Sequence, residues 1–405
     1  MRTIYFDKNI PKVLITKTIR PMWQGVVWSP LSPTTVAEFP EPTLPGPRWI
    51  KVENRACGIC ATDLSLLFVK ADPAIAPAAL PGQSRFYLGH EVVSDVVEVG
   101  GGVTRFKPGD RVVMETRFFG ANCMSQEIDP PCQFCVRHEF GLCENADANV
   151  GPRGVGGGWG DGYTCHETEV FKVPDDITDD QATLIEPTSV AFHGVMRRPP
   201  KNTDHVLVVG AGIIGLLAVQ AVRAVAPECH LTVVAKYPHQ AEAARRFGAN
   251  EIIGREAGYQ AAARITGSQY FTAPLNKGTL SSGFEVIYDC VGHPDTIEDS
   301  LRWARAGGAV VMVGIDLSPM KIDLNPIWHQ EVDLIGSKGF GADEWRGERK
   351  HTFEWVAQLI RAGKFRDDGL ITHRFRLKDY KQAIATSTAK SAAKPIKVVF
   401  ELSRG

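Results

Sequence analysis

The sequence predicts an α/β protein in which a doubly wound parallel sheet is inserted into a mostly β domain built from both ends of the chain. Short apolar segments alternate with helical segments between about residues 196 and 338, which is typical of a parallel sheet covered by helices. Residues 1–195 instead hold short β-rich segments separated by Gly and Pro. Residues 339–405 return to mixed patterns, and we assign them to the first domain.

The expected parallel sheet starts with an apolar run at 205–209. A helix over 213–226, a strand over 231–234 and a helix over 239–247 follow it. Later strands of this sheet are expected at 286–288, 309–313 and 332–335. Outside the sheet, strands are expected at 49–52, 91–99 and 397–401, and a helix near 352–362.

Composition excludes several classes of function. The 405 residues suffice for two or three domains. With 45 basic and 46 acidic residues the net charge is -1, so we expect no nucleic-acid partner. No run of about 18 apolar residues and no secretory signal is visible, so we expect a cytoplasmic protein without a membrane span. Nine cysteines, an odd number, argue against a disulfide framework.

A glycine-rich turn joins the first strand of the expected parallel sheet to its first helix. Residues 210–215 read GAGIIG, which is the pattern G-x-G-x-x-G. Gly210 permits the tight turn, Gly212 lets the backbone approach a pyrophosphate, and Gly215 lets the helix lie close to the strand. The N–H groups of Ile213 and Ile214 begin the helix and face the phosphates. We predict a dinucleotide site; the alternative is a turn without a ligand.

The end of the second strand indicates which dinucleotide binds. An acidic residue there holds the ribose 2′-hydroxyl of NAD. Here Ala235 and Lys236 follow the strand, so no carboxylate is present and a cation stands next to its expected position. This favours NADP, whereas NAD would also serve if Lys236 were only a solvated loop residue. Val291 and Val313, at the ends of later strands, are further candidate cofactor contacts.

Four residues from distant segments form a candidate catalytic metal site. Cys60, His90, Glu91 and Glu186 offer one thiol, one imidazole and two carboxylates. This donor set suits a borderline-soft ion such as Zn²⁺. The structural alternatives are a buried thiol at position 60 and, at position 186, a cap of a helix that begins at Pro187.

The segments GICATD, GHE, LIEPTSV and GAGIIG follow one another along the chain, and ITHRFRLKDYKQA lies near its C-terminus. In these motifs the chain resembles the zinc-dependent medium-chain dehydrogenases that act on alcohols, polyols and sugars. The resemblance implies a GroES-like catalytic domain, a Rossmann domain and a homodimer or homotetramer. It makes Cys60 and His90 zinc ligands and Glu91 a direct or exchanging ligand. It makes Glu186 the residue that holds the metal or a water on it.

Two residues beside Cys60 take further roles by the same resemblance. Thr62 corresponds to the hydroxyl that takes the proton of the substrate alcohol. Asp63 corresponds to the carboxylate that orients a ligand histidine. Alternatively, both cap a helix that begins at Leu64. The chain departs from many alcohol dehydrogenases at Ser65, where those enzymes carry a histidine of the proton relay.

A cysteine-rich segment at about 116–150 resembles the family's structural-zinc lobe. Three of its ligands match Cys132, Cys135 and Cys143. The position of the first ligand is occupied by Asp129, and we favour Cys123 in its place because thiolates bind zinc better in a closed site. Two prolines after Asp129 also predict an extended chain there. The alternative is a loop with reduced thiols and no metal.

The expected function is a zinc-dependent, NAD(P)-linked dehydrogenase that interconverts an alcohol and a carbonyl. Glu186 in its LIEP context and Ser65 favour a secondary alcohol, a polyol or a sugar as the small-molecule substrate. Two alternatives stay open at this point. One is a zinc-free NADPH-dependent quinone or enoyl reductase on the same fold, and the other is an NADPH-binding protein without catalysis.

Overall fold

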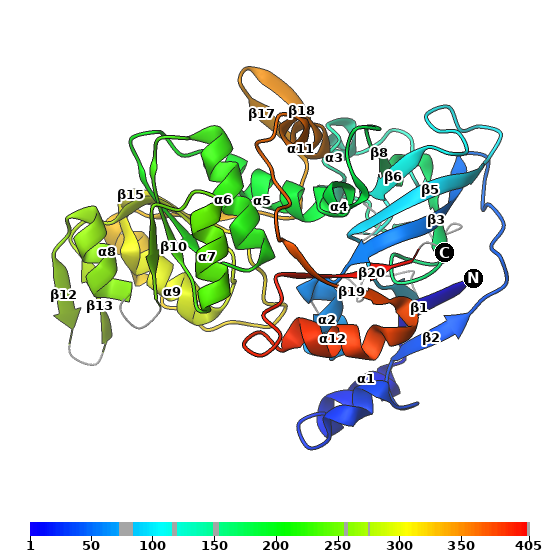
Figure 1. Cartoon of the computed structure of the whole chain (residues 1–405), viewed down its shortest axis with the longest axis horizontal. Helices are drawn as coiled ribbons and strands as arrows, with labels where there is room; N and C mark the ends of the chain where they lie inside the picture. The colour runs from blue at the N-terminus through cyan, green and yellow to red at the C-terminus, as the bar shows by residue number, and fades with distance from the viewer. Residues whose placement is uncertain (73–83, 116–119, 149–153, 255–257, 274–275, 403–405) are drawn as a thin grey trace. The chain divides into compact units, whose positions relative to one another are not determined.

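The chain forms two compact units in the computed structural model (Figure 1). The structure describes residues 1–72, 84–115, 120–148, 154–254, 258–273 and 276–402. The first unit holds Met1–Glu186 and Leu370–Gly405, and the second holds Pro187–Gly369. Both boundaries differ from the expected 195/196 and 338/339. Helix α5 (Ile185–Arg197) runs across the first, and the segment after 338 packs on the second unit, where Asp343 contacts His193.

The first unit contains a seven-stranded sheet. Its order is β19-β20-β3-β5-β6-β8, and β7 also pairs with β3. The strands are β3 (Trp49–Gly58), β5 (Val92–Val99), β6 (Arg111–Met114), β7 (Gly162–His166), β8 (Val170–Lys172), β19 (Ile371–Arg376) and β20 (Lys397–Glu401). Only β19 and β20 are parallel neighbours among these described strands. Val399 of β20 lies opposite Gly58 of β3, so the last strand borders the segment that leads to Cys60.

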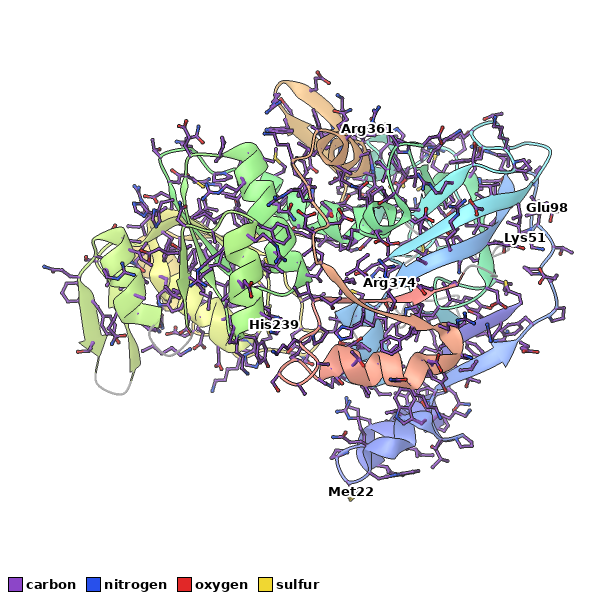
Figure 2. All side chains as sticks on the ribbon, in the orientation of Figure 1. Met22, Lys51, Glu98, His239, Arg361 and Arg374 are labelled. Atoms are coloured by element: carbon purple, nitrogen blue, oxygen red, sulfur yellow. The ribbon has the colours of Figure 1, made fainter. Side chains whose placement is uncertain are left out.

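The N-terminal residues form a small sheet that the sequence patterns do not predict. Strand β1 (Arg2–Asp7) lies between β2 (Thr34–Glu38) and β4 (Arg85–Tyr87), and both pairings are antiparallel. Helix α1 (Ile10–Ile19) follows β1, and the side chain of its N-cap Asn9 accepts a hydrogen bond from a backbone N–H of the first turn. Met22, labelled in Figure 2, comes after this helix with an exposed side chain.

Two helices carry candidate site residues in their first turns. Helix α2 (Ala61–Leu67) begins three residues before the expected start, so Thr62 and Asp63 lie inside it, and its N-cap is Cys60. Helix α5 begins at Ile185, so Glu186 is not its cap. The other helical segments of this unit are α3 (Gln133–Val136), α4 (Asp179–Thr183), α12 (Tyr380–Thr388), η1 (Gln24–Trp28), η4 (Phe140–Leu142), η5 (Glu167–Glu169) and η7 (Leu377–Asp379).

The second unit contains the expected doubly wound sheet, with six parallel strands in the order β11-β10-β9-β14-β15-β16. They are β9 (His205–Val209), β10 (His230–Val234), β11 (Glu251–Ile253), β14 (Phe284–Asp289), β15 (Ala304–Met312) and β16 (Asp333–Gly336). The chain moves outward from β9 in one direction and from β14 in the other. Right-handed crossovers therefore place the helices of the two halves on opposite faces. The predicted fold class is confirmed.

Buried Val, Ile and Leu side chains of these strands pack against the crossover helices. The helices are α6 (Ile213–Val225), α7 (Pro238–Arg246), α8 (Gly258–Thr266), α9 (Pro294–Trp303), α10 (Asn325–Gln330) and α11 (Thr352–Arg361). Two hairpins that the sequence patterns do not predict are β12 (Tyr270–Ala273) with β13 (Asn276–Leu280), and β17 (Ala342–Trp345) with β18 (Glu348–His351). None of the described helices is long and apolar enough to cross a membrane.

Candidate active site

Cys60, His90 and Glu91 lie together in the first unit. Each offers one ligand atom, and these atoms lie within 4.8 Å of one another. Cys60 follows β3 as the N-cap of α2, while His90 and Glu91 directly precede β5. Because β3 and β5 are paired, with residue 57 opposite residue 92, the chain delivers all three side chains to the same end of the two strands.

Asp63 orients His90. The Asp63 side chain is fully buried; its Oδ1 accepts a hydrogen bond from the Gly89 N–H at 2.9 Å, and its Oδ2 lies 3.4 Å from Nδ1 of His90. With Nδ1 facing this carboxylate, Nε2 is the ring nitrogen left for an ion. Burial lowers the pKa of His90, but the charges of Asp63 and Cys60 outweigh it and hold this pKa well above its ordinary value.

Lys397 is the site residue that the sequence analysis missed. It begins β20 and donates hydrogen bonds to Oε1 of Glu91 at 2.6 Å, to Oε2 of the same carboxylate, and to the carbonyl of Ile59 at 3.3 Å. Burial lowers the pKa of Lys397, but Glu91 outweighs this and raises it above its ordinary value. Gly58 leaves room for the pair, since a Cβ there would lie 2.0 Å from Oε2 of Glu91. The only sequence signal for this role is a lysine at the head of an apolar strand.

Glu186 is buried beside this group but is not part of it. Its side chain is 7% exposed, and burial, opposed by the charge of His90, raises its pKa to about 7. The charge of Glu91 also raises the pKa of Glu186, and the charge of Lys397 lowers it. The group of described residues that gathers its ligand atoms within 4.8 Å here consists of Cys60, His90 and Glu91, without Glu186. Glu186 is therefore a neighbour of the candidate metal site in this geometry.

The donor set of this region fits a bound cation. One thiol, one imidazole and one carboxylate offer ligand atoms within 4.8 Å of one another, and the buried carboxyl groups of Asp63 and Glu186 stand beside them. Sulfur, nitrogen and oxygen donors in this combination suit Zn²⁺.

The hydroxyl of Thr62 lies beside one candidate ligand. Its Oγ1 lies 3.5 Å from Sγ of Cys60. Ser65 lies one turn further along α2 and donates its hydroxyl to the carbonyl of Ala61 at 3.0 Å. The residue that replaces the relay histidine is therefore engaged by its own helix.

The four cysteines of the lobe also lie together. Each of Cys123, Cys132, Cys135 and Cys143 offers a sulfur, and all four sulfurs lie within 4.8 Å of one another. Sγ of Cys123 accepts hydrogen bonds from the Cys132 N–H and from the side-chain amide of Asn145, both at 3.4 Å. N–H donors of this kind suit a thiolate. Asp129 is not part of the group, and its bond to Pro130 is cis. Residues 116–119 and 149–150 of the predicted lobe lie outside the described residues.

The glycine-rich turn of the second unit has the geometry that a dinucleotide requires. Gly210 has a φ of +92°, and its N–H donates to the Val234 carbonyl at 3.0 Å. A Cβ at Gly215 would lie 1.8 Å from the Gly210 carbonyl oxygen, so only glycine permits this approach. Gly212 is the N-cap of α6 with open space where its Cβ would stand, and no side chain caps the helix. The first N–H groups of α6, those of Ile213 and Ile214, are thus left for an anion.

The other predicted cofactor residues lie at the same edge of the sheet. Lys236 is exposed, and its Nζ lies 5.5 Å from the centre of the Tyr237 ring. Val291 is 42% exposed and packs over Gly210, whereas Val313 is buried. The side chain of Val313 therefore does not face the surface, and only its backbone is a candidate contact. His239, labelled in Figure 2, lies in the first turn of α7.

Comparisons with known proteins match both units. Residues 46–175 match the model of the alcohol dehydrogenase GroES-like domain, and residues 214–358 match the model of the zinc-binding dehydrogenase. The chain is 29% identical over 360 residues to the L-idonate 5-dehydrogenase of Vitis vinifera, which covers 88% of this chain and 89% of that protein.

Two solved structures are similar along most of the chain. One is the 2R,3R-butanediol dehydrogenase of Bacillus subtilis, with 25% identity and a TM-score of 0.69, covering 91% of this chain and 96% of that one. The other is a zinc-binding dehydrogenase of Sinorhizobium meliloti 1021 bound to NADP, with 25% identity and a TM-score of 0.66, covering 91% and 95%.

Proposed function

Since the chain belongs to the zinc-dependent medium-chain dehydrogenase family, we propose that it oxidises a polyol or another secondary alcohol with a catalytic zinc ion and with NADP as the preferred cofactor. NAD(P)-linked dehydrogenation of alcohols and polyols is the activity of this family. The observation that supports zinc dependence is the gathering of Cys60, His90 and Glu91. A zinc-free reductase would not require a thiol, an imidazole and a carboxylate gathered in this way.

Each residue of the site has a distinct task in this proposal. Cys60 and His90 bind zinc, with Glu91 as a direct or exchanging ligand. When bound, zinc favours ionisation of a substrate hydroxyl, and NADP takes up the hydride. Thr62 accepts the proton of that hydroxyl, and because Ser65 is engaged by its own helix, the proton passes from Thr62 to water.

The neighbouring charges keep these groups in place. Asp63 holds His90 so that Nε2 faces the ion. Lys397 donates hydrogen bonds to both oxygens of the Glu91 carboxylate, and these bonds compete with coordination of zinc by Glu91. Glu186 lies beside the group and is suited to hold a water at the open position. Binding of a second zinc ion by the four lobe cysteines, and assembly as a homodimer or homotetramer, are further parts of the proposal.

The preference for NADP rests on Lys236. No carboxylate follows β10, so nothing repels a 2′-phosphate there, and the ammonium of Lys236 is exposed on the same turn. A charge-assisted contact of this kind is worth about 1.5–3 kcal/mol, or roughly ten- to a hundredfold in affinity. We expect Lys236→Ala to weaken NADP binding by that factor and to leave NAD binding nearly unchanged. Equal kcat/KM values for both cofactors in the unaltered protein would contradict this assignment.

The whole proposal is tested by one set of measurements on the purified protein. Elemental analysis gives the zinc content, and a panel of alditols and secondary alcohols is offered with each cofactor. We expect two zinc ions per chain, turnover of at least one polyol, and loss of turnover after chelation. Full turnover by zinc-free protein would favour the zinc-free reductase, and cofactor binding without turnover of any alcohol would favour a non-catalytic protein.

A further inference from the structure

We propose that helix α1 and the turn after it bind the surface of an anionic phospholipid bilayer. Both belong to the first unit and come before residue 46, where the match to the GroES-like domain model begins. We call their exposed part the N-terminal apolar face, and it consists of Ile10, Leu14, Ile15, Met22 and Trp23. The inference does not depend on the proposed function, because none of these residues belongs to the candidate active site.

Helix α1 turns its apolar side toward solvent. Its opposite side is fixed to the first unit, where Val13 is buried and the buried Thr16 donates its hydroxyl to the carbonyl of Leu31 at 3.1 Å. Ile10 and Leu14 are 61% and 59% exposed. A surface helix of a globular protein has the reverse arrangement, with charged or polar side chains toward water. The exposed side of α1 therefore has the composition of a contact surface.

The turn after the helix extends the apolar face. Met22 and Trp23 are 80% and 52% exposed, and Met22 is labelled in Figure 2. The backbone of this turn is held in place, because the N–H groups of both residues donate to the Ile19 carbonyl at 2.9 Å. Tryptophan is enriched where membrane and water meet, since its ring is apolar and its N–H is polar. Trp23 thus has the chemistry of an interfacial anchor.

Lysines flank the apolar face. At about 100° per residue, Lys12 and Lys17 leave α1 on opposite sides of the exposed face. Neither ammonium group forms an ion pair with a residue that the structure describes. Residues 8–37 include four basic and no acidic side chains, although the whole chain has a net charge of -1. The partner of this face therefore has to offer both apolar matter and negative charge.

An anionic bilayer meets both requirements. Contact between the same faces of two copies would bring their lysines together, and like charges repel. A protein partner would need a groove for the convex face of one helix, whereas lipid chains adapt to it. The apolar side chains enter the boundary of the acyl chains, while the lysine stems extend to the phosphates. With ten residues, α1 is too short to cross a bilayer and lies on its surface.

Flotation of the full-length protein with lipid vesicles tests the inference. Vesicles of phosphatidylcholine alone are compared with an equal mixture of phosphatidylcholine and phosphatidylglycerol. We expect binding to the mixed vesicles only, and binding that weakens as the salt concentration rises. Lys17→Gln should lower the partition constant roughly fivefold, and Leu14→Ser should lower it roughly tenfold or more. The matched controls are Lys364→Gln and Leu324→Ser, which alter exposed residues of the second unit and should bind like the unaltered protein.

Several outcomes would overturn the inference. Equal binding to both kinds of vesicle would remove the role of the lysines, and equal losses in the control variants would remove the role of the face. Thermal unfolding of each variant shows whether a loss reflects misfolding instead. Absence of vesicle binding at low salt would also exclude a bilayer. In that case self-association that Leu14→Ser abolishes would assign the face to a second copy, and retention on immobilised polyglutamate that Lys17→Gln abolishes would assign it to an acidic protein.

Discussion

The two candidate metal groups of the first unit differ in how their charge is balanced. The lobe gathers four sulfurs, from Cys123, Cys132, Cys135 and Cys143. The other group combines a thiol, an imidazole and a carboxylate. Asp63 faces the imidazole of His90, and Lys397 donates hydrogen bonds to the carboxylate of Glu91. Four thiolates close the coordination of zinc, whereas three protein ligands leave a position open. From this comparison we expect the mixed group, whose members are held by Asp63 and Lys397, to be the one that supports catalysis.

The largest effect should follow removal of a ligand from the mixed group. Cys60→Ser should abolish turnover, because a serine hydroxyl is a poor zinc ligand and the open site collapses. Binding of NADPH, followed by its fluorescence, should stay nearly intact because the glycine-rich turn lies in the other unit. Treatment with a strong chelator should give the same loss. Turnover by a Cys60→Ser protein shown to lack zinc at this site would contradict the ligand assignment.

Loss of the proton acceptor should be the next largest effect. Thr62→Val keeps the shape of the side chain and removes the hydroxyl, and loss of a general acid–base group costs about 10²–10⁴-fold in rate. We expect kcat to fall in this range while the zinc content stays unchanged. Thr62→Ser is the matched control, since it keeps the hydroxyl and should restore most of the rate. A full rate for Thr62→Val at neutral pH would show that water accepts the proton directly.

Breaking the buried ion pair between Lys397 and Glu91 should lower the stability of the fold. Lys397→Met leaves the Glu91 carboxylate buried without its cation, and breaking one partner of such a pair costs about 3–5 kcal/mol. We expect the free energy of unfolding, measured in denaturant, to fall by that amount. The double variant Lys397→Met with Glu91→Gln should recover part of the loss, because no uncompensated charge remains. Equal losses in the single and double variants would show that the pair is not coupled.

The smallest effect on turnover should come from the lobe. Cys123→Ser should lower the zinc content from two ions to one per chain and lower the melting temperature, while kcat changes by no more than a few fold. Asp129→Ser is the comparison variant and should keep both ions, because Asp129 is not in the sulfur group. Loss of zinc in Asp129→Ser with full content in Cys123→Ser would reverse the assignment.

The parts of the molecule that local patterns specify were predicted well. The strand at 205–209, the glycine-rich turn and the helix that follows it agree with β9 and α6, because periodicity and turn residues act over a few positions. The ordered motifs pointed to Cys60, His90 and Glu91, whose ligand atoms lie together. Their roles in catalysis stay predictions.

Features that depend on distant pairing were not predicted. Lys397 meets Glu91 across 306 positions, and no spacing rule covers that distance. The small sheet of β1, β2 and β4 joins residues near 5 and 87, and its strands carry charged and polar residues that hide the alternation. The expected domain boundary at 195/196 differs from the unit boundary because α5 continues through it without a break.

The place of Lys397 on β20 has a consequence for biosynthesis. A nascent chain presents Cys60, His90 and Glu91 about 300 residues before it presents their buried cation and the strand that pairs with β3. Until β20 is synthesised, the Glu91 carboxylate can pair only with water or a dissolved ion. The part of β3 that pairs with β20 has no partner strand during that time. Metal loading during translation would therefore meet a Glu91 carboxylate for which Lys397 does not yet compete. The candidate metal site reaches its final arrangement only after β20 has been synthesised and has paired with β3.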